Sequence, residues 1–164
     1  MAHEPRLTTA LRELLAVQRV AALGTLDASG RPFVSMVPFA VDPTSASVII
    51  HVSGLAPHTR NLQTMAHVSL LVVQAEVTGE PVHALPRVTL EGTAAVLLPH
   101  SAAWQSARSA YLARFPEAEP MMQLGDFMLV GIAMTDARQV AGFGAARSVD
   151  AETLAQVLAS AHPV

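Results

Sequence analysis

The stretch at residues 20–41, VAALGTLDASGRPFVSMVPFAV, decides the fold. It contains two runs rich in Val, Leu and Phe, which favour extended strands. Ala28, Ser29 and Gly30 separate the runs and supply the turn. We therefore predict a β-hairpin, with one strand before the turn and one after it.

Further strands are predicted downstream, where short apolar runs alternate with turn-forming residues. The clearest is RVTLEGTAAVL (87–97), whose alternation places Val88, Leu90, Ala94 and Val96 on one face. The other predicted strands are SVIIHV (47–52), HVSLLVVQAEV (67–77), DFMLVGIAM (126–134) and ARQVAGF (137–143).

Four helices are predicted between and around these strands. They cover residues 7–18, a two-turn segment that begins at His58 or Thr59, residues 99–114 and residues 149–161. About seven strand segments with hairpin-length connections disfavour parallel winding. We predict a mainly β fold, an antiparallel barrel with peripheral helices, in a single domain over residues 1–164.

Composition excludes several classes of chemistry. The 164 residues include no cysteine, and all ten basic residues are arginine, so thiolate nucleophiles, Cys-ligated metals and Schiff-base lysines are excluded. The net charge is −3 and the arginines are scattered, which argues against nucleic acid as a partner. No apolar run reaches the length of about 20 residues that spans a bilayer. We expect a soluble, cytoplasmic protein with no membrane partner.

Local motifs for catalysis or metal binding are weak. GFGAAR (142–147) lacks the third glycine of a dinucleotide fingerprint and the chain length that must follow it. The seven histidines form no His-x-His and no pair at helical spacing, so no metal site is predicted. No G-x-S-x-G elbow is present. The sequence names no catalytic residue.

SGLAPHTRNL (53–62) concentrates hydrogen-bond donors between a strand and a helix. Free amides and the helix dipole at such a helix start favour an anion, which the hydroxyl, imidazole and guanidinium groups could also bind. Alternatively, Ser53 and Thr59 only cap the helix and Arg60 lies in solvent. Spacing alone leaves both readings open, and a barrel context favours a phosphate-bearing cofactor.

Taken together, residues 10–148 resemble the FMN-binding split-barrel superfamily of pyridoxamine 5′-phosphate oxidase, in particular its heme-utilisation-like branch. The resemblance is carried by the hairpin, by SGLAPHTRNL followed by VSLLV, by PRVTLEG, and by GDFMLVGI with GFGAA. It implies a core at about residues 10–148, a C-terminal helix at about 149–161, and a homodimer with flavin sites at the subunit interface.

The resemblance also assigns site residues. The flavin ring would lie along Ser35, Met36, Val37, Pro38 and Phe39, with a polar contact from Arg87. The phosphate would be bound by Ser53, His58, Thr59, Arg60 and Asn61. His58 stands where many relatives have lysine, and the Arg-x-His element that holds substrate in true pyridoxamine 5′-phosphate oxidases has no counterpart.

The leading hypothesis is therefore an FMN-dependent oxidoreductase acting on a small-molecule substrate. The main alternative is a non-enzymatic split-barrel module that binds heme, a deazaflavin or another protein. A third hypothesis is a structural dimer partner without a ligand. Heme degradation is a further, less favoured reading.

Overall fold

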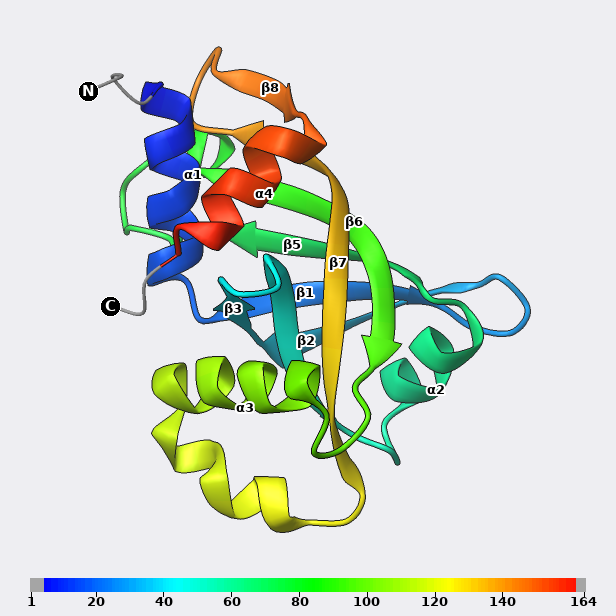
Figure 1. The fold of residues 1–164 in the computed structure, drawn as a ribbon. Coiled ribbons are helices and arrows are strands. Elements are labelled where there is room, and N and C mark those ends of the chain that lie inside the picture. The colour runs from blue at the N-terminus through cyan, green and yellow to red at the C-terminus, as the bar shows by residue number, and fades with distance from the viewer. Residues whose placement is uncertain (1–4, 162–164) are drawn as a thin grey trace.

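The computed structural model describes residues 5–161 and confirms a mainly β fold with peripheral helices (Figure 1). One curled antiparallel sheet forms a half-barrel, with strand order β2-β1-β5-β6-β7-β4-β3 and with β8 paired to β7. The strands are β1 (Val20–Leu26), β2 (Pro32–Pro38), β3 (Ala40–Asp42), β4 (Ser47–Ser53), β5 (His67–Val73), β6 (Arg87–Val96), β7 (Phe127–Val140) and β8 (Ala146–Val149). The helices are α1 (Arg6–Val17), α2 (Pro57–Thr64), α3 (Ala102–Arg114) and α4 (Ala151–Ala159), with 3₁₀ segments η1 (Val82–Ala84) and η2 (Pro116–Gln123).

The predicted hairpin is confirmed as β1 and β2, which pair from Val20 opposite Pro38 to Leu26 opposite Pro32. The Asp27 carboxylate accepts hydrogen bonds from the Ser29 and Arg31 amides, at 2.8 and 3.0 Å. Gly30 adopts a φ of 77°, which glycine reaches without strain. Local side-chain bonding therefore closes the turn, and the hairpin extends away from the body of the molecule (Figure 1).

Several predicted boundaries were wrong. The second strand of the hairpin stops at Pro38, and β3 begins as a separate strand at Ala40. The strand predicted over residues 67–77 ends at Val73, and the third helix begins at Ala102, after the Ser101 N-cap, not near Pro99. The terminal helix spans Ala151–Ala159, inside the predicted 149–161.

The last pair of predicted strands is one continuous strand, β7, which pairs with β6 on one side and with β4 and β8 on the other. The two predicted strands leave out Thr135 and Asp136, but these residues lie in β7, opposite an irregularity between Glu91 and Gly92 of β6. The predicted inner face of β6 is buried at Val88, Leu90 and Ala94, but Val96, the last residue of the strand, is exposed. GFGAAR is a turn between β7 and β8, with positive φ at Gly142 and Gly144.

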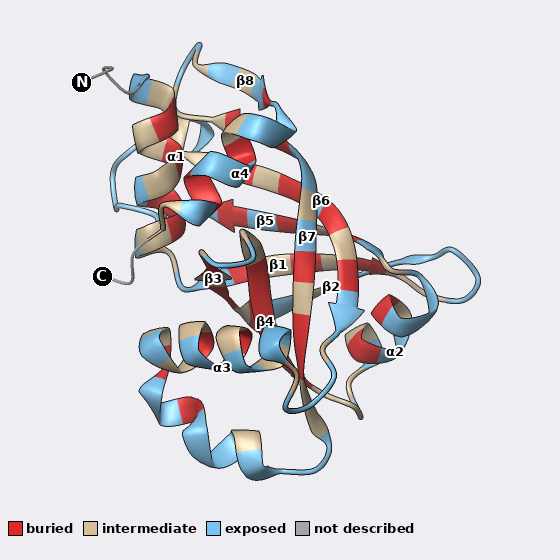
Figure 2. Ribbon diagram, viewed as in Figure 1, coloured by how far each residue is buried: buried red, intermediate tan, exposed pale blue. Residues whose placement is uncertain are grey.

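Two apolar clusters hold the sheet and helices together (Figure 2). The larger joins leucines of α1 and α4 to the inner faces of the strands, with Leu11, Leu23, Leu90 and Leu158 almost completely buried. The smaller packs α3 and η2 on β3, β4 and β7 through Tyr111, Phe115 and Leu129. Within residues 5–161, no helix is long and apolar enough to cross a membrane.

Candidate functional site

Residues 53–62, here called the cradle segment, connect the end of β4 to α2. The hydroxyl of Ser53 donates to the carboxylate of Asp126 at 3.0 Å and accepts the Leu55 amide at 3.2 Å. Asp126 immediately precedes β7, and Ser53 pairs with its neighbour Phe127 in the sheet. The anion that Ser53 contacts is therefore a carboxylate of the chain itself.

Two other donors of the cradle segment are also bonded within the chain. Thr59 is fully buried, and its hydroxyl donates to the Ser53 carbonyl at 2.6 Å. The amide of Asn61 donates through Nδ2 to the Thr25 hydroxyl at 3.0 Å, which ties α2 to β1. These side chains stabilise the junction between β4, α2 and β1 and do not point to an open site.

His58 contacts a second predicted residue, since its Nδ1 lies 2.9 Å from the Ser35 hydroxyl. Burial lowers the pKa of His58 below its ordinary value. The imidazole is consequently neutral at pH 7, so it does not supply the positive charge that a lysine at this position would bring. Arg60 is exposed and has no side-chain partner among the described residues.

The cradle segment retains few groups for the phosphate of FMN. The hydroxyls of Ser53 and Thr59 and one N–H of Asn61 donate within the chain, and the Asp126 carboxylate lies beside Ser53, so the Arg60 guanidinium is the main cation left. A phosphate carries a charge between −1.5 and −2 at neutral pH, so it is repelled by a neighbouring carboxylate.

The residues predicted along the flavin ring do not form one surface. Val37 and Phe39 are buried in the core, where the Arg114 guanidinium lies 5.1 Å from the Phe39 ring centroid. Met36 points to the opposite side of the sheet and is 65% exposed. Pro38 ends β2 and is partly buried.

Arg87 is also separate from the cradle segment. It lies at the start of β6 opposite Val73, whereas α2 leads into the other end of β5 at His67. Its guanidinium donates to the carbonyls of Leu85 and His83, at 2.9 and 3.3 Å. The structure thus brings Ser35 to His58 and Ser53 to Thr59, and it leaves Arg87 apart.

Apolar side chains cover the side of β2, β1 and β5 that faces away from the core. Cross-strand pairing places Met36 beside Ala22 and Ala22 beside Leu71, and places Val34 beside Gly24 and Gly24 beside Ser69. We call this surface the outer face; its exposed apolar residues are Val20, Val34, Met36, Leu71 and Val73. The small residues Ala22 and Gly24 lie between the larger ones.

An open cavity of about 440 Å³ continues the outer face toward the α2 end of the sheet. Gly24, Leu26, Pro32 and Ser69 form much of its lining, and His67 and Glu91 provide polar groups. His67 is exposed, unlike His51, which is packed between the rings of Tyr111 and Phe127. The cavity therefore combines an apolar floor with an accessible imidazole.

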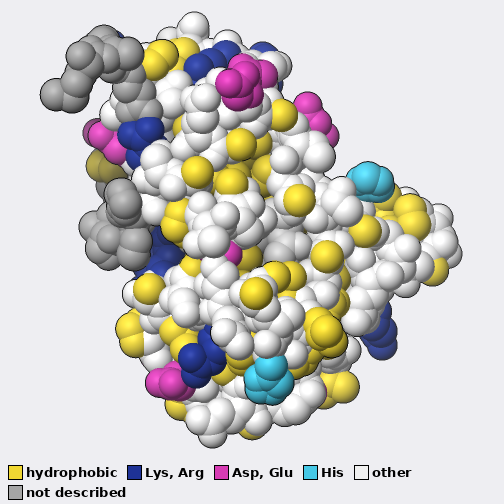
Figure 3. Space-filling view, in the orientation of Figure 1, with side chains coloured by type: hydrophobic (Ala, Val, Ile, Leu, Met, Phe, Trp, Pro, Cys, Tyr) yellow, Lys and Arg dark blue, Asp and Glu magenta, His cyan; other side chains and the backbone are white. Residues whose placement is uncertain are grey.

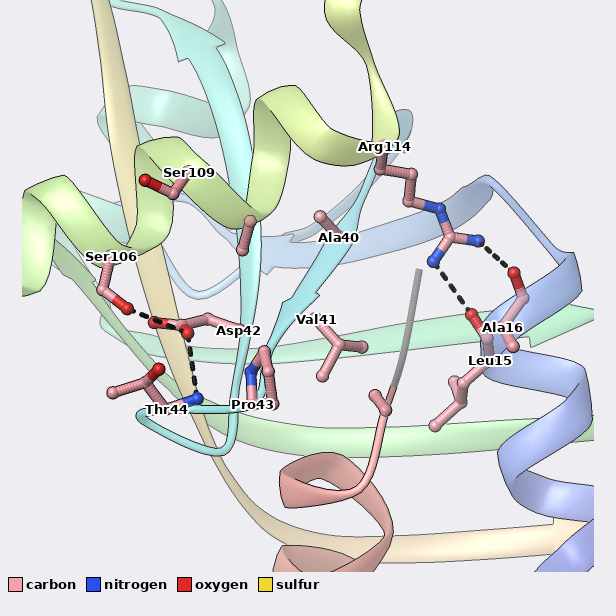
Figure 4. A pocket seen from close by; sticks show the side chains of 12 residues that line it. Leu15, Ala16, Ala40, Val41, Asp42, Pro43, Thr44, Ser106, Ser109 and Arg114 are labelled. Atoms are coloured by element: carbon pink, nitrogen blue, oxygen red, sulfur yellow. Dashed lines mark hydrogen bonds between the residues drawn. The ribbon is translucent and has the colours of Figure 1, made fainter. Parts of the chain in front are cut away.

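A second cavity, of about 240 Å³, lies between α1, β3 and α3 (Figure 4). Its charged groups are bonded within the chain. Buried Asp42 accepts the Thr44 amide and the Ser106 hydroxyl, each at 3.0 Å. Arg114 donates to carbonyls at the end of α1, including those of Leu15 and Ala16. We assign these groups to holding α3 on the fold.

No group of three or more His, Asp or Glu side chains within residues 5–161 could hold a metal ion. Charged side chains are scattered over the surface in Figure 3, and no concentrated basic patch appears on that face.

Sequence reasoning missed three residues of this region: Asp126, Thr25 and His67. Asp126 stands in the GDFMLVGI motif, but only the pairing of β4 with β7 brings it to Ser53. His67 begins the VSLLVV strand, and its outward direction follows from the strand alternation. That alternation was the one available signal.

The model of the pyridoxamine 5′-phosphate oxidase family matches residues 7–141. HutZ, a heme oxygenase of Vibrio cholerae, is 31% identical over 150 residues, which cover 91% of this chain and 84% of HutZ. HOZ, a chloroplastic heme oxygenase of Arabidopsis thaliana, is 37% identical over 119 residues, 71% of this chain and 34% of HOZ.

A solved structure of a heme-binding protein from Mycobacterium smegmatis superposes with a TM-score of 0.82 at 28% identity. The match covers 94% of this chain and 62% of that one. The chain therefore spans most of HutZ, but only part of the other two proteins.

Proposed function

The chain belongs to the pyridoxamine 5′-phosphate oxidase family, and within this family we propose that it binds heme on the outer face and not FMN at the cradle segment. One observation carries the proposal: the exposed apolar surface of Val20, Val34, Met36, Leu71 and Val73 adjoins a cavity that His67 helps to line. The heme-related names of HutZ, HOZ and the Mycobacterium smegmatis protein support the same ligand.

The outer face suits heme because the macrocycle is flat and largely apolar. Gly24 and Ala22 lie in neighbouring rows between the larger side chains of β2 and β5, so a planar group can approach the backbone. Burial of apolar surface contributes roughly 25 cal/mol per Å², which makes a contact of this type favourable. Heme, when bound, supplies redox-active iron to this surface.

Iron in proteins is bound by His, Cys, Met or Tyr, and this chain has no cysteine. Among the described histidines, His67 lines the cavity beside the outer face, whereas His58 contacts Ser35 on the other side of β2. His3 and His162 lie outside the described residues. We propose a histidine ligand and treat His67, His3 and His162 as the set from which experiment must choose.

Titration of the purified protein with hemin, followed by absorbance, tests the proposal. We expect a saturable Soret band, and a parallel titration with FMN that leaves the flavin spectrum and fluorescence unchanged. Stoichiometric, tight FMN uptake without a Soret band would contradict the proposal. The single variants His67→Ala, His3→Ala and His162→Ala are then titrated, since loss of the ligand shifts the Soret maximum. His58→Ala is the control, because His58 lies on the other side of β2, and it should leave the Soret maximum unchanged.

We also propose that a second copy of the chain covers the outer face. Exposed apolar patches of this kind mark interaction sites, and a homodimer would enclose a ligand between two sheets. The expected mass in light scattering at micromolar concentration is twice 17.2 kDa. A monomer both with and without hemin would overturn the dimer and leave the heme titration to be judged separately.

Oxidative breakdown of heme is a second candidate function, favoured by the names of HutZ and HOZ. The test incubates the heme-bound protein with ascorbate in air and with catalase, which removes free hydrogen peroxide. Decay of the Soret band with release of chelatable iron would support turnover. A stable Soret band would leave heme binding alone as the function.

A further inference from the structure

We propose that Asp126 is a specificity-determining residue: its carboxylate excludes the phosphate of FMN, and of related flavins, from the cradle segment. The inference rests on the proposed function, because it explains how a split barrel that binds heme rejects flavin. It adds a role for a residue outside the predicted set of donors.

The geometry places Asp126 at the start of the cradle segment. Its Oδ2 accepts the Ser53 hydroxyl at 3.0 Å, and its carbonyl accepts the Gly54 amide at 2.6 Å. A Cβ at Gly54 would lie 3.2 Å from that carbonyl oxygen, so the two segments are in direct backbone contact. The carboxylate is thus held at the hydroxyl that would otherwise contact a phosphate.

Backbone amides of the segment are mostly occupied too. The Leu55 amide donates to the Ser53 hydroxyl and the Ala56 amide to the Ser53 carbonyl. The amides of Thr59 and Arg60 both donate to the Ala56 carbonyl. Since residue 57 is proline, the His58 amide is the one backbone donor in the first turn of α2 that has no acceptor among the described residues. The segment therefore has this amide and the exposed Arg60 guanidinium left for a phosphate, and the Asp126 carboxylate opposes both.

Electrostatics favours exclusion over simple competition for one hydrogen bond. No basic side chain pairs with Asp126, and it is exposed, so its charge is not neutralised by the described residues. Two like unit charges about 4 Å apart repel each other even in water, and this repulsion raises a dissociation constant roughly fivefold to tenfold. The effect on a phosphate is larger, because a phosphate carries more than one charge. This repulsion weakens as salt screens it.

The test measures FMN affinity by quenching of flavin fluorescence in the wild-type protein and in Asp126→Asn. Asparagine keeps an acceptor for the Ser53 hydroxyl and removes the charge. Glu76→Gln is the matched control. Glu76 is exposed in the loop after β5, so this substitution removes the same charge far from the cradle segment. We expect FMN to bind at least tenfold more tightly to Asp126→Asn, and Glu76→Gln to match the wild type.

Salt provides a second measurement. The gain in FMN affinity of Asp126→Asn over the wild type should shrink as NaCl rises from 20 mM to 500 mM, because salt screens the repulsion. A purely structural effect would not change with salt. Equal FMN affinity of all three proteins, or an equal gain in both variants, would overturn the inference. Tight FMN binding by the wild type would overturn it as well. Hemin titration of the wild type tests the proposed heme binding independently. A failure of the proposed function can therefore be told apart from a failure of the role of Asp126.

Discussion

The cradle segment and the outer face lie on opposite sides of the same hairpin. They differ in whether their side chains find partners within the chain. In the cradle segment, Ser53, Thr59 and Asn61 donate to acceptors within the chain. On the outer face, Val34 and Met36 are 67% and 65% exposed in the single chain. The region rich in donors is closed, and the apolar region is open.

This difference shows why donor content alone does not locate a ligand site. A buried polar group must find a partner, and the chain can supply that partner itself. Strand alternation fixes which side chains point outward, so the chain cannot bury the exposed apolar ones itself. Their burial requires a ligand or a second molecule. Four predictions test the contrast.

The largest effect is expected on the outer face. The double variant Val34→Asp/Met36→Asp should weaken hemin binding at least hundredfold, or about 2.7 kcal/mol, because it would place charges against an apolar ligand. Both side chains are exposed, so the unfolding free energy should change by no more than about 0.5 kcal/mol each. Leu98→Asp, at another exposed apolar position, is the control for hemin titration. Unchanged affinity would show that heme does not contact this surface.

A smaller effect is expected inside the cradle segment. Thr59→Val removes a buried hydroxyl and leaves the Ser53 carbonyl without that donor, which should cost about 2 kcal/mol of unfolding free energy in urea denaturation. Thr64→Val, at an exposed position of the same helix, should cost under about 0.5 kcal/mol. Hemin affinity should be unchanged in both variants. A loss of hemin affinity in Thr59→Val, with the fold intact, would assign the segment to the ligand site.

The pH dependence of stability should be weaker still. Burial lowers the pKa of His51 and of His58, so the folded state binds fewer protons than the unfolded state just below pH 6.5. Stability therefore falls as the pH drops below about 6.5, and it is flat above that value for these two groups. His51→Phe and His58→Gln should each reduce this slope in denaturation measured from pH 5 to 8. An unchanged slope in both would contradict the role of burial.

The smallest effect is expected at Arg60. Its side chain is exposed and has no partner in residues 5–161, so Arg60→Ala should change the unfolding free energy by less than about 0.5 kcal/mol. Hemin uptake should also stay the same, because Arg60 is not on the outer face. Loss of hemin binding in Arg60→Ala would mean that the ligand reaches α2, which would erase the contrast between the two regions.

Much of the fold could be predicted because its determinants are local. The turn at Asp27–Arg31 is closed by side-chain bonds within five residues, and the alternation of Val88 and Leu90 fixes the buried face of β6. The continuity of β7 through Thr135 and Asp136 could not be read locally, because it depends on pairing with strands far away in sequence. Family membership was predicted correctly from ordered motifs.

The site was harder to predict than the fold. The contact of Ser35 with His58 joins two of the predicted residues, yet Phe39 is buried under Arg114 and Arg87 lies at the far end of β6. Asp126 reaches Ser53 from 73 residues away, through strand pairing that no short motif encodes. Residue types indicated where donors gather, but only the tertiary structure shows which of them are already used.

Methyl NMR with gallium protoporphyrin IX, a diamagnetic flat macrocycle that stands in for heme, tests the central claim most directly. Ring currents shift nearby methyl groups strongly, so the ligand reports its own position. We predict large upfield shifts at Val34, Met36 and Leu71 and none at Leu55 or Thr59. Shifts confined to Leu55 and Thr59, with the outer face unchanged, would contradict the account and return the ligand to the cradle segment.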